Sequence, residues 1–483
     1  MSPAETSPGN PPPPPPEPSS PEPRLPEELA SDLAACLAVE DDGRQELAVR
    51  IAASPAYRRS SVGPWLHQLD LWPALPPGRR DLRVPVGGGE VRPVLLRVPR
   101  GYTPSRPWPF IYLLHPSGAT GPSFLSYLEQ LLKERIEEFV VAAPTDYRQT
   151  GLDAPPPFTV DHPEIFETVR RAAHIDAERC YALGYSTGGY AAWAVALLHA
   201  DLLAGAVALG SVFTVPPGED GLWQEVLPNL AQVPVIHVWG DRDSMPVTAI
   251  GAPRSMGTMA EINERFRGWT RGMRLPIEDC RVPGRGHGGL VPPAASLTRL
   301  LAGRRARYPR QVDHTFRHVF QGQAYWLEAH SWEGEHWGPG FPRYQRRPGE
   351  SDPQALGRAV ADLLGRLRGE IDGQTVRLDR RHVGELTVWV GEGMIDWQRP
   401  VAIEVGGKRV FSGPLQPDLA LCLAQAARTF DFDRLRWAGV RIDREGRAQP
   451  VTARTAFSPR LAKGAAAPPR REPAAGRPPR RRG

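Results

Sequence analysis

The pattern of apolar and polar positions divides the chain into segments of different character. Between residues 81 and 303, short apolar runs alternate with stretches in which apolar residues recur every three to four positions. The runs, bounded by glycine, proline or aspartate, predict strands at 94–98, 110–114, 139–143, 180–183, 206–209, 235–239 and 277–282. The longer stretches predict helices at 124–137, 163–173, 188–199, 260–271 and 293–301. This alternation predicts one α/β domain, with a mostly parallel sheet covered by helices on both faces.

The segments on either side of this domain have different patterns. Leucines at three- to four-residue spacing predict helix across 27–53, so residues 27–80 are interpreted as a helical preface that packs on the α/β domain. Residues 311–450 contain short apolar runs separated by turn residues, which predict a β-rich accessory domain. Its predicted strands are 311–320 paired with 323–331 across Gln321-Gly322, then 375–380, 385–390, 401–405 and 408–411. Gly406-Gly407 is predicted as a two-residue hairpin turn, and helices are predicted at 352–368 and 418–429.

Both ends of the chain have compositions that cannot build a core. Residues 1–26 contain twelve prolines and are predicted to be a disordered, extended arm. Residues 454–483 carry nine of the 59 basic residues and one of the 54 acidic residues, and are predicted to be a disordered basic tail. The whole chain has a net charge of +5, so the part without this tail is at about −3. A folded body this close to neutral does not favour nucleic-acid binding.

Other features exclude several classes of protein. The four cysteines lie far apart and none belongs to a Cys-x-x-Cys pair, which excludes a disulfide scaffold and a zinc ribbon. His314, His318, His330 and His336 cluster in the sequence without an acid or cysteine at ligand spacing, so a structural role is predicted rather than a metal site. The first thirty residues contain no apolar signal region, and no run of eighteen apolar residues exists. A cytoplasmic protein without a membrane span is therefore expected; the oligomeric state is not predicted.

One short motif combines the features of a nucleophilic serine. Ser186 lies in Gly184-Tyr185-Ser186-Thr187-Gly188, between a predicted strand and a predicted helix. At a sharp turn from strand to helix, the residues two positions from the serine must be small for the turn to close. The hydroxyl then projects above the sheet, next to a helix N-terminus that favours developing negative charge. In a chain with 48 glycines the bare pattern arises easily by chance, so its context carries the prediction.

The residues downstream supply the groups that such a serine needs. A serine hydroxyl requires a base, and the base requires an acid that orients it. In a sheet of this kind the acid and the base follow the serine in that order. The predicted strand 235–239 leads into Asp241 and Asp243, and the next strand, 277–282, leads into His287. Both loops belong to the carboxyl edge of the sheet, where open α/β sheets bind their ligands. Spacing alone leaves both aspartates as candidates.

Residues 81–303 resemble α/β-hydrolases of the esterase type, a group related to polyhydroxybutyrate depolymerases, feruloyl esterases and prolyl oligopeptidases. The resemblance rests on the serine motif, the two downstream loops, and the segments 98–102, 109–115 and 176–181. It implies that Ser186 is the nucleophile and that His287 is the general base and then the general acid. It also implies that Asp243, three residues after the glycine that ends the strand, is the orienting acid, with Asp241 as the alternative.

The same resemblance implies an oxyanion hole built from two backbone N–H groups. One belongs to Thr187, the residue after the nucleophile, and the other to Ser117, in the loop after His115. The family usually has glycine directly after this histidine, whereas this chain has Pro116. Proline lacks an N–H group, but the donor position is Ser117, so the departure affects the conformation of the loop more than the donor.

Together these residues predict a serine hydrolase that cleaves a carboxylic ester through an acyl-enzyme and needs no metal or organic cofactor. A peptidase of the prolyl-oligopeptidase type would use the same triad. The roughly eighty residues before the domain are too few for the propeller such peptidases usually carry, which favours an esterase. A binding or scaffold protein on a relic hydrolase core is a second alternative, which the intact triad disfavours. The short connection between 206–209 and 235–239 predicts an accessible site without a large lid; the acyl and alcohol groups are not predicted.

Overall fold

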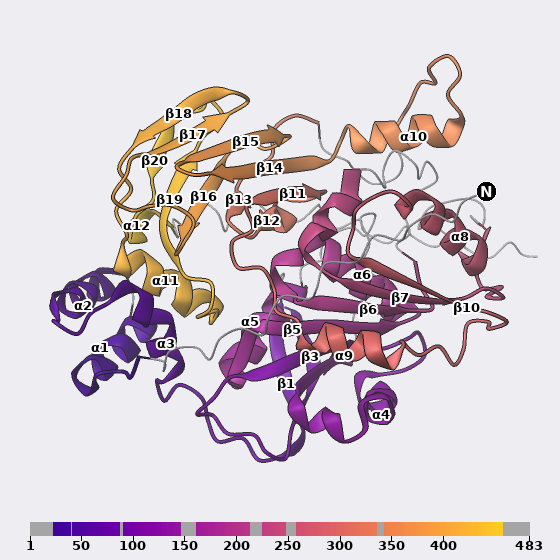
Figure 1. The fold of residues 1–483 in the computed structure, drawn as a ribbon, viewed down its shortest axis with the longest axis horizontal. Helices are drawn as coiled ribbons and strands as arrows, with labels where there is room; N and C mark the ends of the chain where they lie inside the picture. Colours follow the sequence, from indigo (N-terminus) through magenta and orange to yellow (C-terminus); the bar gives the residue numbers. More distant parts are fainter. Residues whose placement is uncertain are drawn as a thin grey trace, which may run out of the picture.

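The computed structural model describes residues 23–39, 41–86, 90–145, 161–212, 225–247, 257–335 and 342–456. Within them, a central eight-stranded sheet has the order β1-β2-β4-β3-β5-β6-β7-β10 (Figure 1). The six strands from β4 to β10 pair in parallel, and β1 and β2 add an antiparallel edge. The strands are β1 (Gly78–Val86), β2 (Glu90–Val98), β3 (Trp108–Leu114), β4 (Val140–Pro144), β5 (Ile175–Tyr185), β6 (Gly205–Leu209), β7 (Val235–Gly240) and β10 (Ile277–Val282).

Helices cover both faces of this sheet, because its central strands are apolar on both sides. One face packs against α5 (Asp161–Ala172), α6 (Thr187–Leu198) and α8 (Met259–Thr270). The opposite face packs against α4 (Gly121–Leu132) and α9 (Ala294–Ala302). The mostly parallel sheet between two helical layers is thus confirmed. Strand β1 was not predicted, because its charged residues and its half-exposed edge position hide the apolar pattern.

The accessory part, residues 311–456, contains two five-stranded sheets. The first has the order β11-β14-β15-β17-β18, and the second has the order β12-β13-β16-β19-β20. The hairpin turn at Gly406-Gly407 is present, since both residues have positive φ, 57° and 77°, and Val405 pairs with Lys408. The strands are β11 (Gln311–Phe316), β12 (Gln323–Ala324), β13 (Leu327–Ala329), β14 (Gly365–Asp372), β15 (Thr375–Arg381), β16 (Leu386–Gly391), β17 (Val401–Val405), β18 (Lys408–Gly413), β19 (Arg436–Ile442) and β20 (Ala448–Pro450).

Two predictions for the accessory part are wrong. Residues 311–320 and 323–331 do not pair with each other: β11 pairs with β14, whereas β12 and β13 pair together and join β16 in the other sheet. The predicted helix 352–368 ends early, because α10 covers Asp352–Ala361 and the following residues enter strand β14. Both errors involve the pairing of β11 with β14, which lie far apart in the sequence. Local apolar spacing does not specify such a pairing.

The N-terminal helices pack mainly on the C-terminal part, whereas the prediction placed residues 27–80 on the α/β domain. His67 and Trp72 do contact that domain, at His174. α1 (Glu27–Ala38), α2 (Asp41–Ala53) and α3 (Val62–His67) form a second core with α11 (Leu419–Thr429) and α12 (Ala453–Ala456). Figure 1 shows these indigo helices beside the yellow C-terminal elements. The buried members include Leu33 and Cys36 from the N-terminal side and Cys422 from α11. The N-terminal helices and the C-terminal part therefore share one apolar core, which brings the two ends of the described chain together.

The predicted limits of both terminal segments also differ from the structure. Residues 23–25 bind α3: Gln68 donates to the Pro23 carbonyl oxygen at 2.9 Å, Trp65 to that of Arg24 at 3.1 Å, and Leu25 N donates to Gln68 Oε1 at 2.9 Å. At the other end, α12 reaches residue 456. The predictions of disorder for residues 1–22 and 457–483 concern residues outside the described ranges. Within those ranges, no helix is both long and apolar enough to cross a bilayer.

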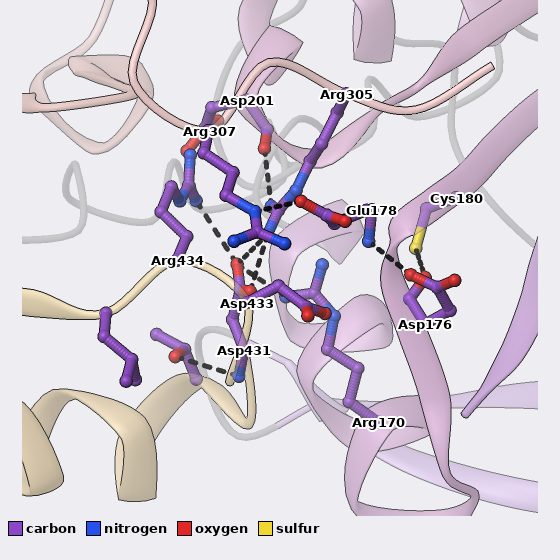
Figure 2. A network of polar contacts seen from close by, with 12 residues as sticks. Arg170, Asp176, Glu178, Cys180, Asp201, Arg305, Arg307, Asp431, Asp433 and Arg434 are labelled. Carbon is purple, nitrogen blue, oxygen red and sulfur yellow. Dashed lines mark hydrogen bonds and ion pairs between the residues drawn. The ribbon is translucent and has the colours of Figure 1, made fainter. Parts of the chain in front are cut away.

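A buried network of charges joins the α/β domain to the accessory part (Figure 2). Arg305, which follows α9, donates to both carboxylate oxygens of Asp431, at 2.6 and 2.7 Å, and to the Asp201 carbonyl oxygen. Arg434 pairs with the Asp201 carboxylate at 2.8 Å. Burial alone would raise the pKa of Asp431, but Arg305, Arg170 and Arg434 together hold this pKa below its ordinary value. The junction is therefore a paired, hydrogen-bonded ion cluster.

Candidate active site

Strand β5 and helix α6 place Ser186 at a sharp turn. The serine is the N-cap residue of α6 and has φ 54° and ψ −118°, a conformation that non-glycine residues rarely adopt. A Cβ atom at Gly184 would lie 1.9 Å from the Gly188 carbonyl oxygen, and one at Gly188 would lie 2.0 Å from that of Leu114. Glycine is therefore required at both positions two residues from Ser186, as the motif predicts.

The structure brings Ser186, His287 and Asp243 together. Nδ1 of His287 lies 2.7 Å from Oδ2 of Asp243, and Nε2 of His287 lies 2.9 Å from Oγ of Ser186. A carboxylate only accepts hydrogen bonds, so Nδ1 carries the hydrogen and Nε2 is left to accept from the serine hydroxyl. Asp243 is buried, whereas a quarter of the His287 side chain is exposed. This arrangement can deprotonate Ser186 and stabilise the imidazolium that results.

The order of these groups along the chain settles the fold. Ser186 follows β5, Asp243 follows β7 and His287 follows the edge strand β10, all in a sheet whose first two strands are antiparallel. The chain has the α/β-hydrolase fold. In this fold the three side chains come from separate loops at the carboxyl edge of the sheet, where ligands bind in open α/β sheets.

Comparisons with known proteins give distant structural neighbours only. No protein-family model matches the sequence, and no curated protein matches it. A thermostable esterase matches at 16% identity and a TM-score of 0.35, over 47% of this chain and 63% of that one. S-formylglutathione hydrolase from Staphylococcus aureus matches at 14% identity and 0.34, over 47% and 97%. Poly(aspartic acid) hydrolase-1 from Sphingomonas sp. KT-1 matches at 17% and 0.37, over 44% and 95%. The fold assignment rests on strand order and not on these scores.

Asp241, the alternative acid, has different partners in the structure. Its Oδ1 accepts a hydrogen bond from Gly284 N at 2.6 Å, and its Oδ2 pairs with Arg281 at 3.1 Å. These contacts join the loop after β7 to the loop after β10, three residues before His287. Asp241 therefore braces the loop that carries the histidine, and its carboxylate does not contact the imidazole.

The two predicted oxyanion residues lie next to each other. The Ser117 and Thr187 hydroxyls are in hydrogen-bonding contact, and a Cβ atom at Gly188 would collide with the backbone of Leu114 and His115. The loop after β3 is thus packed directly on the turn that holds Ser186. Thr187 is the first residue of α6, where backbone N–H groups have no helical partner. Pro116 therefore does not prevent the loop from reaching the turn.

Sequence reasoning missed Tyr185, which holds the loop of the histidine. Its hydroxyl donates to the His287 carbonyl oxygen at 2.6 Å and accepts from Leu290 N at 3.3 Å. Burial raises the pKa of Tyr185 above its ordinary value, so the hydroxyl keeps the hydrogen that it donates. Its position inside the serine motif was the available signal, but that position accepts many residue types.

The histidine cluster and a cleft beside the accessory part lie away from Ser186, Asp243 and His287. His314 bonds to the Gln321 carbonyl oxygen at 2.6 Å and His330 to the Thr387 hydroxyl at 2.6 Å, while His336 is outside the described residues. Across the described ranges, no three His, Cys, Asp or Glu side chains are grouped to hold a metal. A cleft of about 650 Å³ opens between the α/β domain and the first accessory sheet. The residues that line it do not include Ser186, Asp243 or His287.

Proposed function

We propose that this chain is a serine hydrolase that cleaves a carboxylic ester through an acyl-enzyme. The observation that carries the proposal is the continuous hydrogen-bonded series from Asp243 through His287 to Ser186, at 2.7 and 2.9 Å. A serine hydroxyl bonded to a histidine that is itself oriented by a buried carboxylate is the arrangement that activates a nucleophile.

The proposed reaction has two halves. Ser186 Oγ attacks the ester carbonyl while Nε2 of His287 takes its proton, and the backbone N–H groups of Ser117 and Thr187 stabilise the oxyanion. His287 then gives the proton to the leaving alcohol, and the acyl group remains on Ser186. In the second half His287 takes a proton from water as the water attacks the acyl carbonyl. His287 then returns this proton to Ser186 Oγ as the bond between Oγ and the acyl group breaks, and the carboxylic acid leaves.

The test is the substitution Ser186→Ala. Only one oxygen atom is removed, so the fold should persist while hydrolysis of a short-chain aryl ester falls by at least ~10³-fold. A fluorophosphonate probe should label the wild-type enzyme on Ser186, located by peptide mass spectrometry, and should not label the variant. Ser105→Ala is the matched control, because Ser105 is an exposed serine bonded to Thr103 in the loop before β3. Activity of Ser186→Ala within about tenfold of wild type would refute the proposal.

The same assay separates the alternatives left open by the sequence. An aryl ester and an anilide with the same acyl group differ only in the bond that is cleaved. An esterase should prefer the ester strongly, whereas a peptidase should also turn over the anilide. A protein that neither reacts with the probe nor hydrolyses either substrate would be the scaffold alternative.

A further inference from the structure

A second histidine–carboxylate pair lies behind the proposed triad, on the side of helices α6 and α8. His237 on β7 is completely buried, and its Nε2 lies 2.8 Å from the Ser211 carbonyl oxygen. Its Nδ1 lies 3.2 Å from Oδ1 of Asp279, on the neighbouring strand β10. The same carboxylate accepts from Trp239 Nε1 at 2.8 Å and pairs with Arg267 of α8 at 3.3 Å. The proposed triad includes none of these groups.

The surroundings of the His237 ring fix its orientation. Trp193 of α6 and Phe266 of α8 each meet the ring edge to face, with centroids 5.3 and 5.5 Å away. The Ser211 carbonyl oxygen only accepts hydrogen bonds, so Nε2 carries a hydrogen. On the opposite side Nδ1 faces the Asp279 carboxylate, a contact that pairs opposite charges when the imidazole is protonated. The bond to Ser211 and the contact with Asp279 set the rotation of the ring, and the two aromatic side chains pack around it.

The carbonyl group that His237 binds belongs to a segment in contact with the catalytic candidates. Two residues earlier, the Leu209 carbonyl oxygen accepts from Ser186 N at 2.8 Å. Between them, Gly210 has φ 53°, and a Cβ atom there would lie 3.5 Å from Cε1 of His287. A Cβ atom at Gly189 would collide with the Ser211 hydroxyl. Residues 209–211 therefore touch the serine, the histidine and the first turn of α6.

We propose that His237 is a positioning residue for the hydrolysis: its bond to the Ser211 carbonyl holds residues 209–211 and thereby the distance between Ser186 and His287. Asp279 orients the imidazole for this bond. The inference rests on the proposed function, because it concerns the geometry of the same serine and histidine. A misplacement of reacting groups by about 1 Å can cost up to ~10²-fold in rate, so loss of this support should reduce turnover without changing substrate binding.

The experiment compares three variants of the full chain. His237→Leu is apolar and cannot bond to Ser211. His237→Gln retains a donor that can reach the Ser211 carbonyl. Phe266→Leu is the matched control, because it loosens the packing around His237 without removing a hydrogen bond. For each variant, kcat and KM for the aryl ester, the rate constant for fluorophosphonate labelling of Ser186 and the melting temperature are measured.

The expected pattern separates positioning from stability. His237→Leu should lower kcat and the labelling rate constant by at least ~10-fold with KM within about twofold of wild type. His237→Gln should recover most of both rates, and Phe266→Leu should lower the melting temperature while kcat stays within about twofold. If His237→Leu does not fold, His237→Asn replaces it, since its shorter amide can reach Asp279 but not Ser211.

Three results would overturn the inference. The first is wild-type kcat in the variant that lacks the Ser211 bond. The second is an equal loss of kcat in Phe266→Leu, which would make His237 a packing residue only. A glutamine variant as slow as the leucine variant would also contradict it, because the donor would not matter. Failure of the proposed function is a different result: Ser186→Ala would then keep its activity, or the wild-type enzyme would not be labelled.

Discussion

Ser186 adopts a backbone conformation that costs energy, and its neighbours hold it there. A non-glycine residue at φ 54° and ψ −118° stores of the order of 1–3 kcal/mol of strain. Its N–H donates to Leu209 O at 2.8 Å, and its carbonyl oxygen accepts from Tyr190 N at 3.0 Å, which fixes the turn on both sides. This backbone conformation points the Ser186 hydroxyl towards His287.

The two aspartates after β7 should respond differently to the same substitution. Asp243→Asn removes the charge that orients and stabilises the His287 imidazolium, and should lower kcat/KM by up to ~10⁴-fold. Asp241→Asn loses an ion pair to the half-exposed Arg281, worth about 0.2–1 kcal/mol, and its amide oxygen can still accept from Gly284. That variant should keep kcat/KM within severalfold and melt slightly earlier. Comparing kcat/KM and melting temperature decides the assignment; an inactive Asp241→Asn beside an active Asp243→Asn would reverse it.

Helix α3 lies against the C-terminal part at a very short distance. A Cβ atom on Gly63 would lie 2.9 Å from the Phe432 carbonyl oxygen, so a side chain there requires backbone movement. His67 on the same helix pairs with Asp433 at 3.2 Å and bonds to His174 of the α/β domain at 2.9 Å. This short helix therefore contacts both larger parts of the molecule.

Two glycines in N-terminal helices test this contact. In a helix, glycine is normally less stable than alanine by roughly 0.5–1 kcal/mol. Gly43→Ala in α2 should follow that rule, since its new methyl group would meet only the Val39 side chain, at 3.7 Å. Gly63→Ala should instead lower the free energy of unfolding by about 1–3 kcal/mol, because α3 must move away from residue 432. Urea unfolding of both variants measures the difference. An alanine at 63 that stabilises the protein would show that α3 is not packed this closely.

On the scale of the whole molecule, one apolar core extends from the α/β domain into the accessory part. Val312 and Phe316 of β11 belong to the same cluster as the residues of β3, α6 and β7. The buried ion network of Figure 2 lies at this junction. In it, each of four charged residues takes part in at least one ion pair: Asp201, Arg305, Asp431 and Arg434. The two parts are therefore expected to unfold together.

Asp431→Asn should weaken that junction strongly. It leaves the buried Arg305 without its bidentate partner, which costs about 3–5 kcal/mol for a buried ion pair. Asp443→Asn is the matched control, because Asp443 pairs with the exposed Arg447 and its loss should change the free energy of unfolding little. Urea unfolding at neutral pH measures both. An equal, small effect of the two substitutions would contradict a structural role for the network.

The pH dependence of the Asp431→Asn effect supplies an independent check. The pKa of Asp431 is lowered in the folded protein, so its carboxylate contributes stability above the ordinary pKa of about 4. This contribution decreases as the pH falls below that value and the unfolded chain binds the proton. The difference in unfolding free energy between wild type and Asp431→Asn should therefore shrink in acid.

The sequence by itself determined the features that depend on neighbours along the chain. The 3.6-residue and continuous apolar patterns predicted the layers of the α/β domain, and glycines at 184 and 188 predicted the turn at Ser186, because a sharp turn excludes side chains locally. Only the tertiary structure decided which aspartate contacts His287, since Asp241 and Asp243 lie on one short loop whose path determines where each carboxylate points. It likewise decided that β11 pairs with β14 and that α1–α3 pack on α11. Apolar faces specify that a segment must be covered, but not which distant segment covers it.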